Sequence, residues 1–276
     1  MRLHKLSALL TVATLSIGLA ACGSDKKAAT PSNNSTTSTP APAKTVTVAV
    51  ENQYPPFNYI NKDTKKGEGF DYDVWAEICK RINCKPEFKQ ASFEGMIQAV
   101  GDKQFDVAAD GITITPERAK VVDFSDGYIA VNETLIVKKG ESRFTTLDAF
   151  KAGTYKIGTQ TGTTNYDTSV KEYGKGRTKA FETFPFAVQA MLNGDVDAVL
   201  IDDTAGQGYV GADRGKIEQM NGTLKSDELG FIFPKGSAIL AQVNKALKDM
   251  KADGSFKKIT DKYFDPAFTA PVAPSK

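Results

Sequence analysis

The clearest element that the sequence predicts is a helix in Gly69-Phe-Asp-Tyr-Asp-Val-Trp-Ala-Glu-Ile-Cys-Lys-Arg-Ile82. The apolar residues recur at helical spacing from Phe70 to Ile82, so one face is predicted to pack on a core. Asn83 follows as a suitable left-handed stop. Trp75 lies on the apolar side, and we therefore interpret it as core packing and not as a platform for a ligand.

Strands and helices alternate along the rest of the chain. We expect strands over 45–50, 85–89, 105–108, 134–137, 155–158 and 198–201, helices over 93–100, after Pro116, and over 164–173, 187–193, 239–250 and 256–263, and a loop over 54–59. Alternation of this kind predicts α/β layers with a largely parallel sheet. Because the pattern runs through twice, the chain is expected to form two lobes.

The first residues have the pattern of an export signal. Arg2 and Lys5 precede the apolar run 6–19, which is short for a bilayer span, and the small residues Ala20 and Ala21 suit a peptidase. Residues 1–21 are therefore interpreted as a signal peptide. A membrane-anchoring helix is the alternative.

A lipid anchor is predicted directly after this signal. Leu19-Ala-Ala-Cys22 resembles the lipobox of bacterial lipoproteins, in which the cysteine is lipidated and becomes the first residue of the mature chain. Such an anchor holds a protein at a membrane without spanning it. Residues 22–44 lack apolar periodicity, which predicts a flexible tether. The alternative for Cys22 is a stray cysteine in a leader.

Composition and charge exclude several functional classes. The chain has 276 residues, 41% of them hydrophobic and 25% charged, as in a soluble protein with one large domain or two lobes. Without Arg2 and Lys5 the 33 remaining basic residues balance the 33 acidic ones, which leaves no basic footprint for nucleic acid. His4 leaves with the leader, which excludes Ser-His-Asp triads, Cys-His pairs and histidine metal sites. We expect no cofactor, no metal and no nucleic-acid partner.

Two cysteines, Cys79 and Cys84, remain beside Cys22. Export places them in an oxidising compartment, and their position near the end of a helix, before a new strand, can bring them within bonding reach. We predict a disulfide. Two buried free thiols are the alternative, because separation in sequence does not fix the distance between the Cα atoms.

Several further motifs, in the same order along the chain, carry a resemblance to a known family. The helix 69–82 looks like the signature helix of the polar-amino-acid family of bacterial extracellular solute-binding proteins, family 3. The other matching runs are Tyr54-Pro-Pro-Phe57, Phe93-Glu-Gly-Met-Ile97, Phe105-Asp-Val-Ala-Ala-Asp-Gly-Ile-Thr-Ile-Thr-Pro-Glu-Arg-Ala-Lys-Val-Val-Asp-Phe-Ser-Asp126, Gly158-Thr-Gln-Thr-Gly-Thr-Thr164 and Asp197-Ala-Val-Leu-Ile-Asp202. Together they cover about residues 46–264.

The resemblance implies an α/β, two-lobed periplasmic-binding-protein-like fold of type II, with a ligand cleft between lobes that two crossing segments join. We expect lobe 1 at 45–130 and 230–268, lobe 2 at 131–229, crossing segments near 128–133 and 228–230, and a flexible tail at 269–276. Domain interfaces and the edges of open α/β sheets are also where ligands bind on physical grounds.

The same resemblance implies the extracytoplasmic substrate-binding subunit of an ABC importer for a polar L-amino acid, anchored by lipidated Cys22. Such a subunit is expected to be a monomer, to close around a free amino acid without catalysis, and to deliver it to a permease and its ATPase subunits. Two alternatives stay open. One is a secreted cyclohexadienyl (arogenate or prephenate) dehydratase on the same fold, and the other is the ligand-sensing subunit of a receptor.

A desolvated amino acid needs charged or multiply hydrogen-bonding partners for its carboxylate and its ammonium group. Arg118 can hold the carboxylate with two parallel bonds, and Thr115-Pro-Glu117 before it is interpreted as N-cap, N1 and N2 of a helix. In the other lobe, Gly162, Thr163 and Thr164 precede a helix whose free N–H groups favour an anion. One carboxylate held by both lobes would couple binding to closure.

The resemblance assigns the ammonium group to Asp202, assisted by the Gly111 carbonyl and the Thr113 hydroxyl. It also places Tyr54 and Phe93 where aromatic rings sandwich the side chain of the ligand. The alternatives are a solvated surface pair for Arg118 and Asp202, ordinary core rings for the two aromatic residues, and a plain turn glycine at Gly162.

Specificity is expected where family members differ. Glu51 matches a position that often faces the side chain of the ligand, and Asp110 stands where a small or hydroxyl residue is more usual. Two carboxylates there favour a basic amino acid such as arginine, lysine, ornithine or histidine. Two points oppose this: Asp110 can instead bond to backbone or to a nearby lysine, and Ile201 adds an apolar wall.

Overall fold

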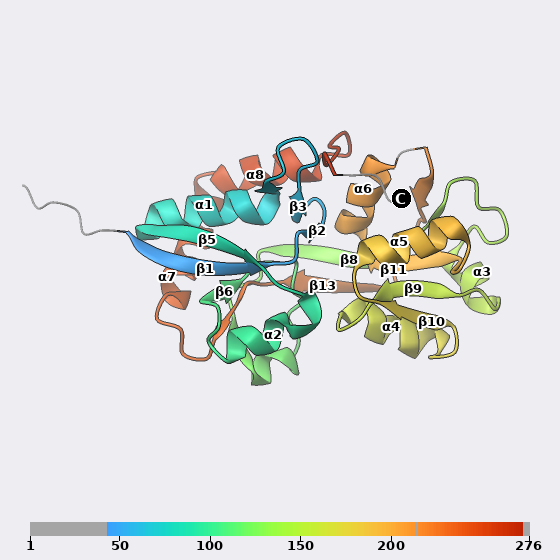
Figure 1. The fold of residues 1–276 in the computed structure, drawn as a ribbon, viewed down its shortest axis with the longest axis horizontal. Coiled ribbons are helices and arrows are strands. Elements are labelled where there is room, and N and C mark those ends of the chain that lie inside the picture. The colour runs from blue at the N-terminus through green and yellow to red at the C-terminus, as the bar shows by residue number, and fades with distance from the viewer. Residues whose placement is uncertain (1–42, 214, 273–276) are drawn as a thin grey trace, which may run out of the picture. The chain divides into compact units, whose positions relative to one another are not determined.

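The computed structural model describes residues 43–213 and 215–272. All of them fall within one compact unit, Pro42–Lys276. The predicted signal peptide, Cys22 and nearly all of the predicted tether lie outside the described residues. Within the unit the chain builds two α/β lobes, each on its own sheet (Figure 1).

Lobe 1 is built on a five-stranded sheet with the order β5-β1-β6-β14-β7. Its strands are β1 (Lys44–Val50), β5 (Cys84–Gln90), β6 (Val107–Ala108), β7 (Val122–Phe124) and β14 (Ile232–Pro234). Its helices are α1 (Phe70–Ile82), α2 (Phe93–Gly101), α7 (Leu240–Ala252) and α8 (Ser255–Phe264), with the short 3-10 helix η1 (Arg118–Lys120). Side chains of β1 alternate between two buried clusters: Val48 and Val50 pack with α1, and Ala49 packs with α2, so the sheet is covered on both faces.

Lobe 2 is built on a six-stranded sheet with the order β10-β9-β11-β8-β12, and β13 also pairs with β8. Its strands are β8 (Ile129–Lys138), β9 (Ile157–Gln160), β10 (Thr178–Phe181), β11 (Ala198–Asp202), β12 (Ile217–Gln219) and β13 (Lys225–Leu229). Its helices are α3 (Leu147–Ala152), α4 (Thr164–Tyr173), α5 (Phe184–Asn193) and α6 (Asp203–Ala212).

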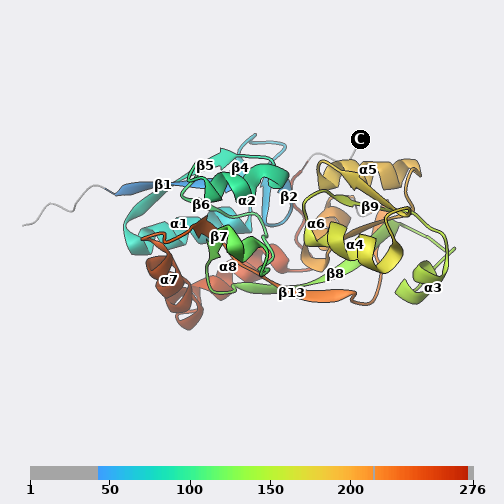
Figure 2. The ribbon, with the colours of Figure 1, turned by 90° about the horizontal axis from the view of Figure 1, so that it is seen from below.

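Two paired strands connect the lobes. β8 and β13 run antiparallel from the pair Ile129↔Leu229 to the pair Glu133↔Lys225, and Figure 2 shows them side by side between the lobes. The prediction of a largely parallel sheet is wrong, because both sheets are mixed. The chain leaves lobe 1 along β8 and returns along β13 and β14, and these strands pair antiparallel with their neighbours. Because β8 and β13 pair at the junction, we still propose residues 45–130 and 230–268 for lobe 1 and residues 131–229 for lobe 2.

The segment after β1 forms a hairpin and not the predicted loop. β2 (Gln53–Tyr54), β3 (Asn58–Ile60) and β4 (Gly67–Glu68) make a small antiparallel sheet, with a cis peptide bond between Pro55 and Pro56. The N–H groups of Phe70 and Asp71, at the start of α1, donate to the carbonyls of Pro56 and Phe57. These bonds fix the hairpin to lobe 1.

Other boundaries also differ from the predictions. The helix expected after Pro116 is only the single turn η1, and the strand expected at 155–158 lies at Ile157–Gln160. Lys44, expected in the tether, already pairs in β1 with Cys84. The expected flexible tail is wrong for its first residues: Ala270 is buried, and the Pro271 carbonyl accepts a hydrogen bond from the Lys62 N–H.

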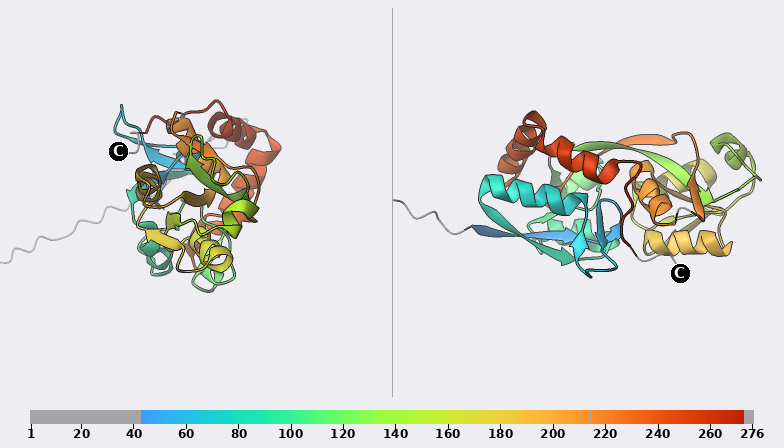
Figure 3. Two further views of the ribbon diagram at one scale, coloured as in Figure 1. Left: turned by 90° about the vertical axis from the view of Figure 1, so that its right-hand side faces the viewer. Right: turned by 90° about the horizontal axis from the view of Figure 1, so that it is seen from above.

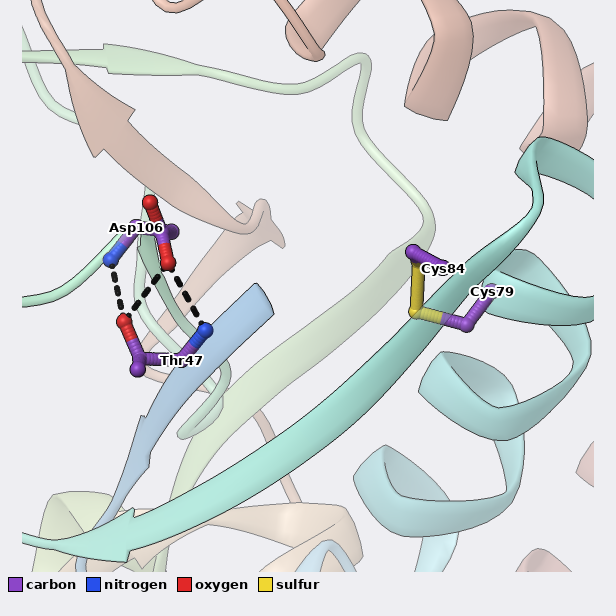
Figure 4. Close-up of a disulfide and its surroundings, with 4 residues drawn as sticks. All are labelled: Thr47, Cys79, Cys84 and Asp106. Carbon is purple, nitrogen blue, oxygen red and sulfur yellow. Dashed lines mark hydrogen bonds between the residues drawn. A yellow bond between two sulfur atoms is a disulfide. The ribbon is translucent and has the colours of Figure 1, made fainter. Parts of the chain in front are cut away.

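The edge of the lobe 1 sheet is cross-linked. Cys79 of α1 and Cys84 of β5 form a disulfide, with their Cα atoms 4.4 Å apart (Figure 4). On the neighbouring strand β1, the N–H and the hydroxyl of Thr47 each donate a hydrogen bond of 2.8 Å to the carboxylate of Asp106, which directly precedes β6. Among the described residues, no helix is long and apolar enough to cross a membrane.

Candidate functional site

A cavity between the lobes is lined by every predicted ligand-binding residue except Gly162. Gln160, Asn165 and Phe184, which the sequence did not single out, complete the lining. Ile201 is fully buried in β11 and does not line the cavity, so the expected apolar wall is absent from the lining.

Arg118 begins η1 and reaches from lobe 1 to lobe 2. Its N–H group donates to the hydroxyl of Thr115, but the prediction of Thr115 as N-cap is wrong: only one helical turn forms, and Glu117 is its N-cap. Its Nη1 donates to the carbonyl of Thr113 at 2.8 Å, and its Nη2 donates to the carbonyl of Gly162 at 3.1 Å. Its guanidinium also lies 5.7 Å from the centre of the Phe93 ring. The group is therefore held in place and points across the cavity.

The start of α4 forms the facing wall. Thr163 is the N-cap of this helix, and its hydroxyl accepts from the N–H of Tyr166. The hydroxyl oxygen of Thr164 lies 3.2 Å from that of Thr113 in lobe 1. Gly162 has a φ of 75°, a left-handed conformation that favours glycine, and its carbonyl turns towards Arg118. The free N–H groups of a helix N-terminus favour an anion here.

Asp202 stands opposite, as the last residue of β11 and the N-cap of α6. Its two carboxylate oxygens accept from the hydroxyl of Tyr54 at 2.6 Å and from the amide of Asn165 at 3.0 Å. Burial raises the pKa of Asp202 to about 6, and these two hydrogen bonds oppose the rise. The carboxylate is thus stabilised by neutral donors alone, and an ammonium group would be a stronger partner.

Two more carboxylates belong to lobe 1. Glu51, directly after β1, accepts from the Gln160 amide of lobe 2 at 2.8 and 3.0 Å. Asp110 accepts a hydrogen bond of 2.9 Å from the N–H of Glu51. Of the two alternatives considered for Asp110, a bond to the backbone and a bond to a nearby lysine, the structure therefore shows the first. Burial raises the pKa of Glu51, and burial together with the negative charge of Glu51 raises the pKa of Asp110 well above its usual value. Neither carboxylate has an ion-pair partner among the described residues.

Aromatic rings complete the lining. Tyr54 stacks on Phe184 of α5 with ring centres 5.5 Å apart and on Phe57 at 5.3 Å. Phe93, the first residue of α2, is buried beneath Arg118. Phe184 belongs to lobe 2, so the Tyr54 ring packs across the interface between the lobes.

Hydrogen-bonding groups of the two lobes satisfy one another across the cavity. The pairs are Arg118 with Gly162, Thr113 with Thr164, Tyr54 with Asp202, and Glu51 with Gln160. The cavity measures about 10 Å³, which is room for about one water molecule. A ligand the size of an amino acid must therefore separate the lobes slightly and exchange these bonds for its own.

A larger groove, of about 440 Å³, opens elsewhere between the hairpin and helices α5 and α6. It contains none of the predicted ligand-binding residues, and its wall includes Pro55, Phe186 and Tyr209. The described residues contain no group of three or more His, Cys, Asp or Glu side chains that could hold a metal ion.

The profile of the "Bacterial extracellular solute-binding proteins, family 3" matches residues 46–266. This chain belongs to that family. The resemblance inferred from the ordered motifs is thereby confirmed, and with it the class of proteins that bind solutes outside the cytoplasm.

Individual relatives agree with this assignment. The chain is 33% identical to the L-cystine-binding protein TcyA of Bacillus subtilis over 79% of this chain and 81% of the relative. It is 30% identical to the arginine-binding extracellular protein ArtP of Bacillus subtilis over 93% and 96% of the two chains. Among solved structures, the arginine-, lysine-, histidine-binding protein ArtJ of Geobacillus stearothermophilus superposes with a TM-score of 0.74, at 33% identity, over 80% of this chain and 95% of the other.

Proposed function

We propose that this chain is the substrate-binding subunit of an ABC importer and that it takes up a basic L-amino acid by closing its two lobes. The observation that carries this proposal is the charge of the cavity lining. Three carboxylates, those of Glu51, Asp110 and Asp202, face a single cation, Arg118. With all four groups ionised the set carries a net charge of −2; a ligand with two positive charges and one negative charge reduces it to −1, whereas an amino acid with a neutral side chain leaves it at −2.

The α-groups of the ligand find partners in both lobes. Its carboxylate would replace the Gly162 carbonyl as partner of Arg118 and would meet the hydroxyl of Thr164 at the start of α4. Its ammonium group would replace the Tyr54 hydroxyl as partner of Asp202, with the Gly111 carbonyl and Thr113 hydroxyl assisting. Because each α-group touches lobe 1 and lobe 2, binding and closure would be thermodynamically coupled.

The side chain of the ligand would lie beside Glu51 and Asp110. Burial raises the pKa values of both carboxylates, and a neutral side chain would leave them without a cation. A guanidinium or ammonium group would offset this cost. L-Cystine, which the relative TcyA binds by its name, would bring a second ammonium group but also a second carboxylate towards the same two residues. The names of ArtP and ArtJ agree with a basic ligand.

The remaining parts of the proposal concern the setting. The mature protein would be a monomer, anchored outside the cytoplasm by lipid on Cys22, and would present its closed form to a permease with ATPase subunits. We propose no catalysis, since the relatives described above are named as binding proteins. A dehydratase would need a buried carboxylic acid as general acid, so prephenate and arogenate belong in the test.

Calorimetry on the purified protein at pH 7.5 tests this proposal with L-arginine, L-lysine, L-histidine, L-glutamine and L-cystine. Arginine or lysine should bind tightest, by about tenfold or more over glutamine. In a parallel melting experiment, the tightest ligand at a hundredfold excess over its Kd should stabilise the fold by about 2.7 kcal/mol. Tightest binding of glutamine or cystine would contradict the basic ligand. No binding of any amino acid, or turnover of prephenate or arogenate, would contradict the transport function.

A further inference from the structure

Helix α6 of lobe 2 contacts lobe 1 through one face that does not line the cavity. Gly208 and Gly211 lie three residues apart and therefore on the same side of the helix. A Cβ atom added at Gly208 would lie 2.3 Å from the carbonyl oxygen of Pro55, and one added at Gly211 would lie 3.0 Å from that of Phe268. At Gly208 only glycine allows the backbone of α6 to approach Pro55 so closely, whereas at Gly211 a larger residue would have to displace Phe268 by a few tenths of an ångström.

Tyr209, between the two glycines, adds a direct bond between the lobes. Its hydroxyl donates to the carbonyl oxygen of Gln53, the first residue of β2, at 2.5 Å. The side chain is almost fully buried, and neither partner lines the ligand cavity. The bond therefore joins the lobes independently of any ligand contact.

The chain after α8 lies against the same helix. It leaves α8 at Phe264, passes α6 near Gly211, and reaches the hairpin, where the Pro271 carbonyl accepts from the Lys62 N–H at 2.7 Å. Figure 3 (right) shows this dark red segment beside α6 and the blue hairpin. The exposed surface of Ala270 within it is only 2%. α6 thus packs on two separate parts of lobe 1.

The other face of α6 is fixed to lobe 2. Gly206 packs on the Gln219 amide and on Ile136 of β8, so the helix moves with the lobe 2 sheet. Asp202, the proposed partner of the ammonium group of the ligand, is the N-cap of the same helix. Any change in the distance between α6 and the hairpin therefore also moves Asp202 relative to Tyr54.

We infer that this face of α6 is a closure contact, in which Gly208 and Tyr209 set how completely the lobes close and hence the affinity for every ligand alike. The inference rests on the proposed binding by lobe closure. When the closed form is the one that binds, the measured affinity is reduced by the fraction of molecules that can reach it. Contacts between the lobes raise that fraction, and because they do not touch the ligand they do not discriminate among ligands.

The test compares Gly208→Ala with Gly95→Ala, a matched glycine replacement in helix α2, where an added Cβ meets nothing within 4 Å. Gly208→Ala should raise the Kd for arginine and for glutamine by the same factor, about tenfold or more, mainly through faster dissociation. Gly95→Ala should leave both Kd values unchanged. Gly95→Ala should also not lower the melting temperature of the unliganded protein, because its added Cβ meets nothing and alanine favours helix more than glycine does.

Tyr209→Phe provides a second, milder variant, which removes one hydrogen bond and keeps the ring. It should raise both Kd values about fivefold, the equivalent of about 1 kcal/mol. A changed ratio of arginine to glutamine affinity in either variant would overturn the inference, since it would mean that α6 selects the ligand. Unchanged Kd values for both variants would overturn it as well.

Small-angle X-ray scattering without ligand separates this inference from the proposed function. Gly208→Ala should have a larger radius of gyration than the natural protein and Gly95→Ala, because α6 can no longer approach Pro55. If the natural protein binds no amino acid, the proposed function fails, and the scattering comparison still tests the contact. Equal radii for all three proteins would overturn it.

Discussion

The cavity holds two sets of charged side chains, and the protein holds them in different ways. Arg118 and Asp202 have opposite charges, come from different lobes, and bond to neutral groups of the facing lobe. Glu51 and Asp110 have the same charge, come from the same lobe, and are linked by a backbone bond. The first set suits the two α-groups that every amino acid carries, whereas the second can recognise only what differs between amino acids. Substitutions in the two sets should therefore have different signatures.

The largest effect is expected at Arg118. Arg118→Ala should weaken every amino acid by about 3 to 5 kcal/mol, at least about a hundredfold in Kd, because a buried carboxylate loses its bidentate partner. Arg118→Lys should restore only part of this loss, since an ammonium group cannot reproduce the planar fork. Calorimetry with arginine and glutamine measures both variants. Normal binding by Arg118→Ala would show that the α-groups bind elsewhere.

A smaller, gradual change in ligand affinity is expected as the pH is lowered. The pKa of Asp202 is raised by burial to about 6, whereas an ammonium group needs the charged carboxylate. Affinity should therefore fall about tenfold per pH unit below about pH 6. Kd measured from pH 4.5 to 8 checks this, and Asp202→Asn should bind weakly with a flatter profile. A natural protein whose Kd is constant over this range would contradict the role of Asp202.

The stability of the unliganded protein should respond to pH with the opposite sign. The folded pKa of Asp202 lies above the ordinary value of 3.8, so its protonated form is favoured by folding. The resulting stabilisation is complete below about pH 4 and is lost as the pH rises through about 6. Glu133 and Asp71, whose pKa values burial raises to about 7, add to the same trend. Melting without ligand, with Asp202→Asn as control, isolates the part due to Asp202.

The parts of the fold that could be predicted are those with local causes. The bounds of α1 were predicted as observed, because its apolar period and the left-handed Asn83 lie within the segment itself. α6 was missed: three glycines within it lower its helix propensity, and packing between the lobes holds it in place. The hairpin was missed as well, because its bonds to α1 are made with residues further along the chain.

The residues of the candidate site also divide into those that the sequence could predict and those that it could not. Most of the lining could be named from motifs that carry charged or aromatic residues in a fixed order. Gln160 lies within one of those motifs, but nothing in the sequence shows that its amide bonds Glu51, a residue 109 positions away. Nor does the sequence show that the Asn165 amide bonds Asp202 or that the Phe184 ring stacks on Tyr54. The pairs Gln160–Glu51 and Phe184–Tyr54 arise only when the two lobes come together, and the pair Asn165–Asp202 only when α4 packs on β11 within lobe 2.

The smallest and most selective effect is expected at the two like charges. Glu51→Gln and Asp110→Asn remove a charge while keeping an oxygen that accepts from Gln160 and from the Glu51 N–H, so the geometry of the cavity is retained. Each should weaken arginine about fivefold to tenfold, the equivalent of about 1 to 1.4 kcal/mol, and change glutamine by less than about twofold. The reason is electrostatic: a cationic side chain loses a partner, whereas a neutral one gains a cavity with one less buried charge. Calorimetry with both ligands on both variants measures the ratio. If the two ligands weaken equally, or neither changes, the basic side chain is not recognised by this pair, and the contrast between the two sets of charges does not hold.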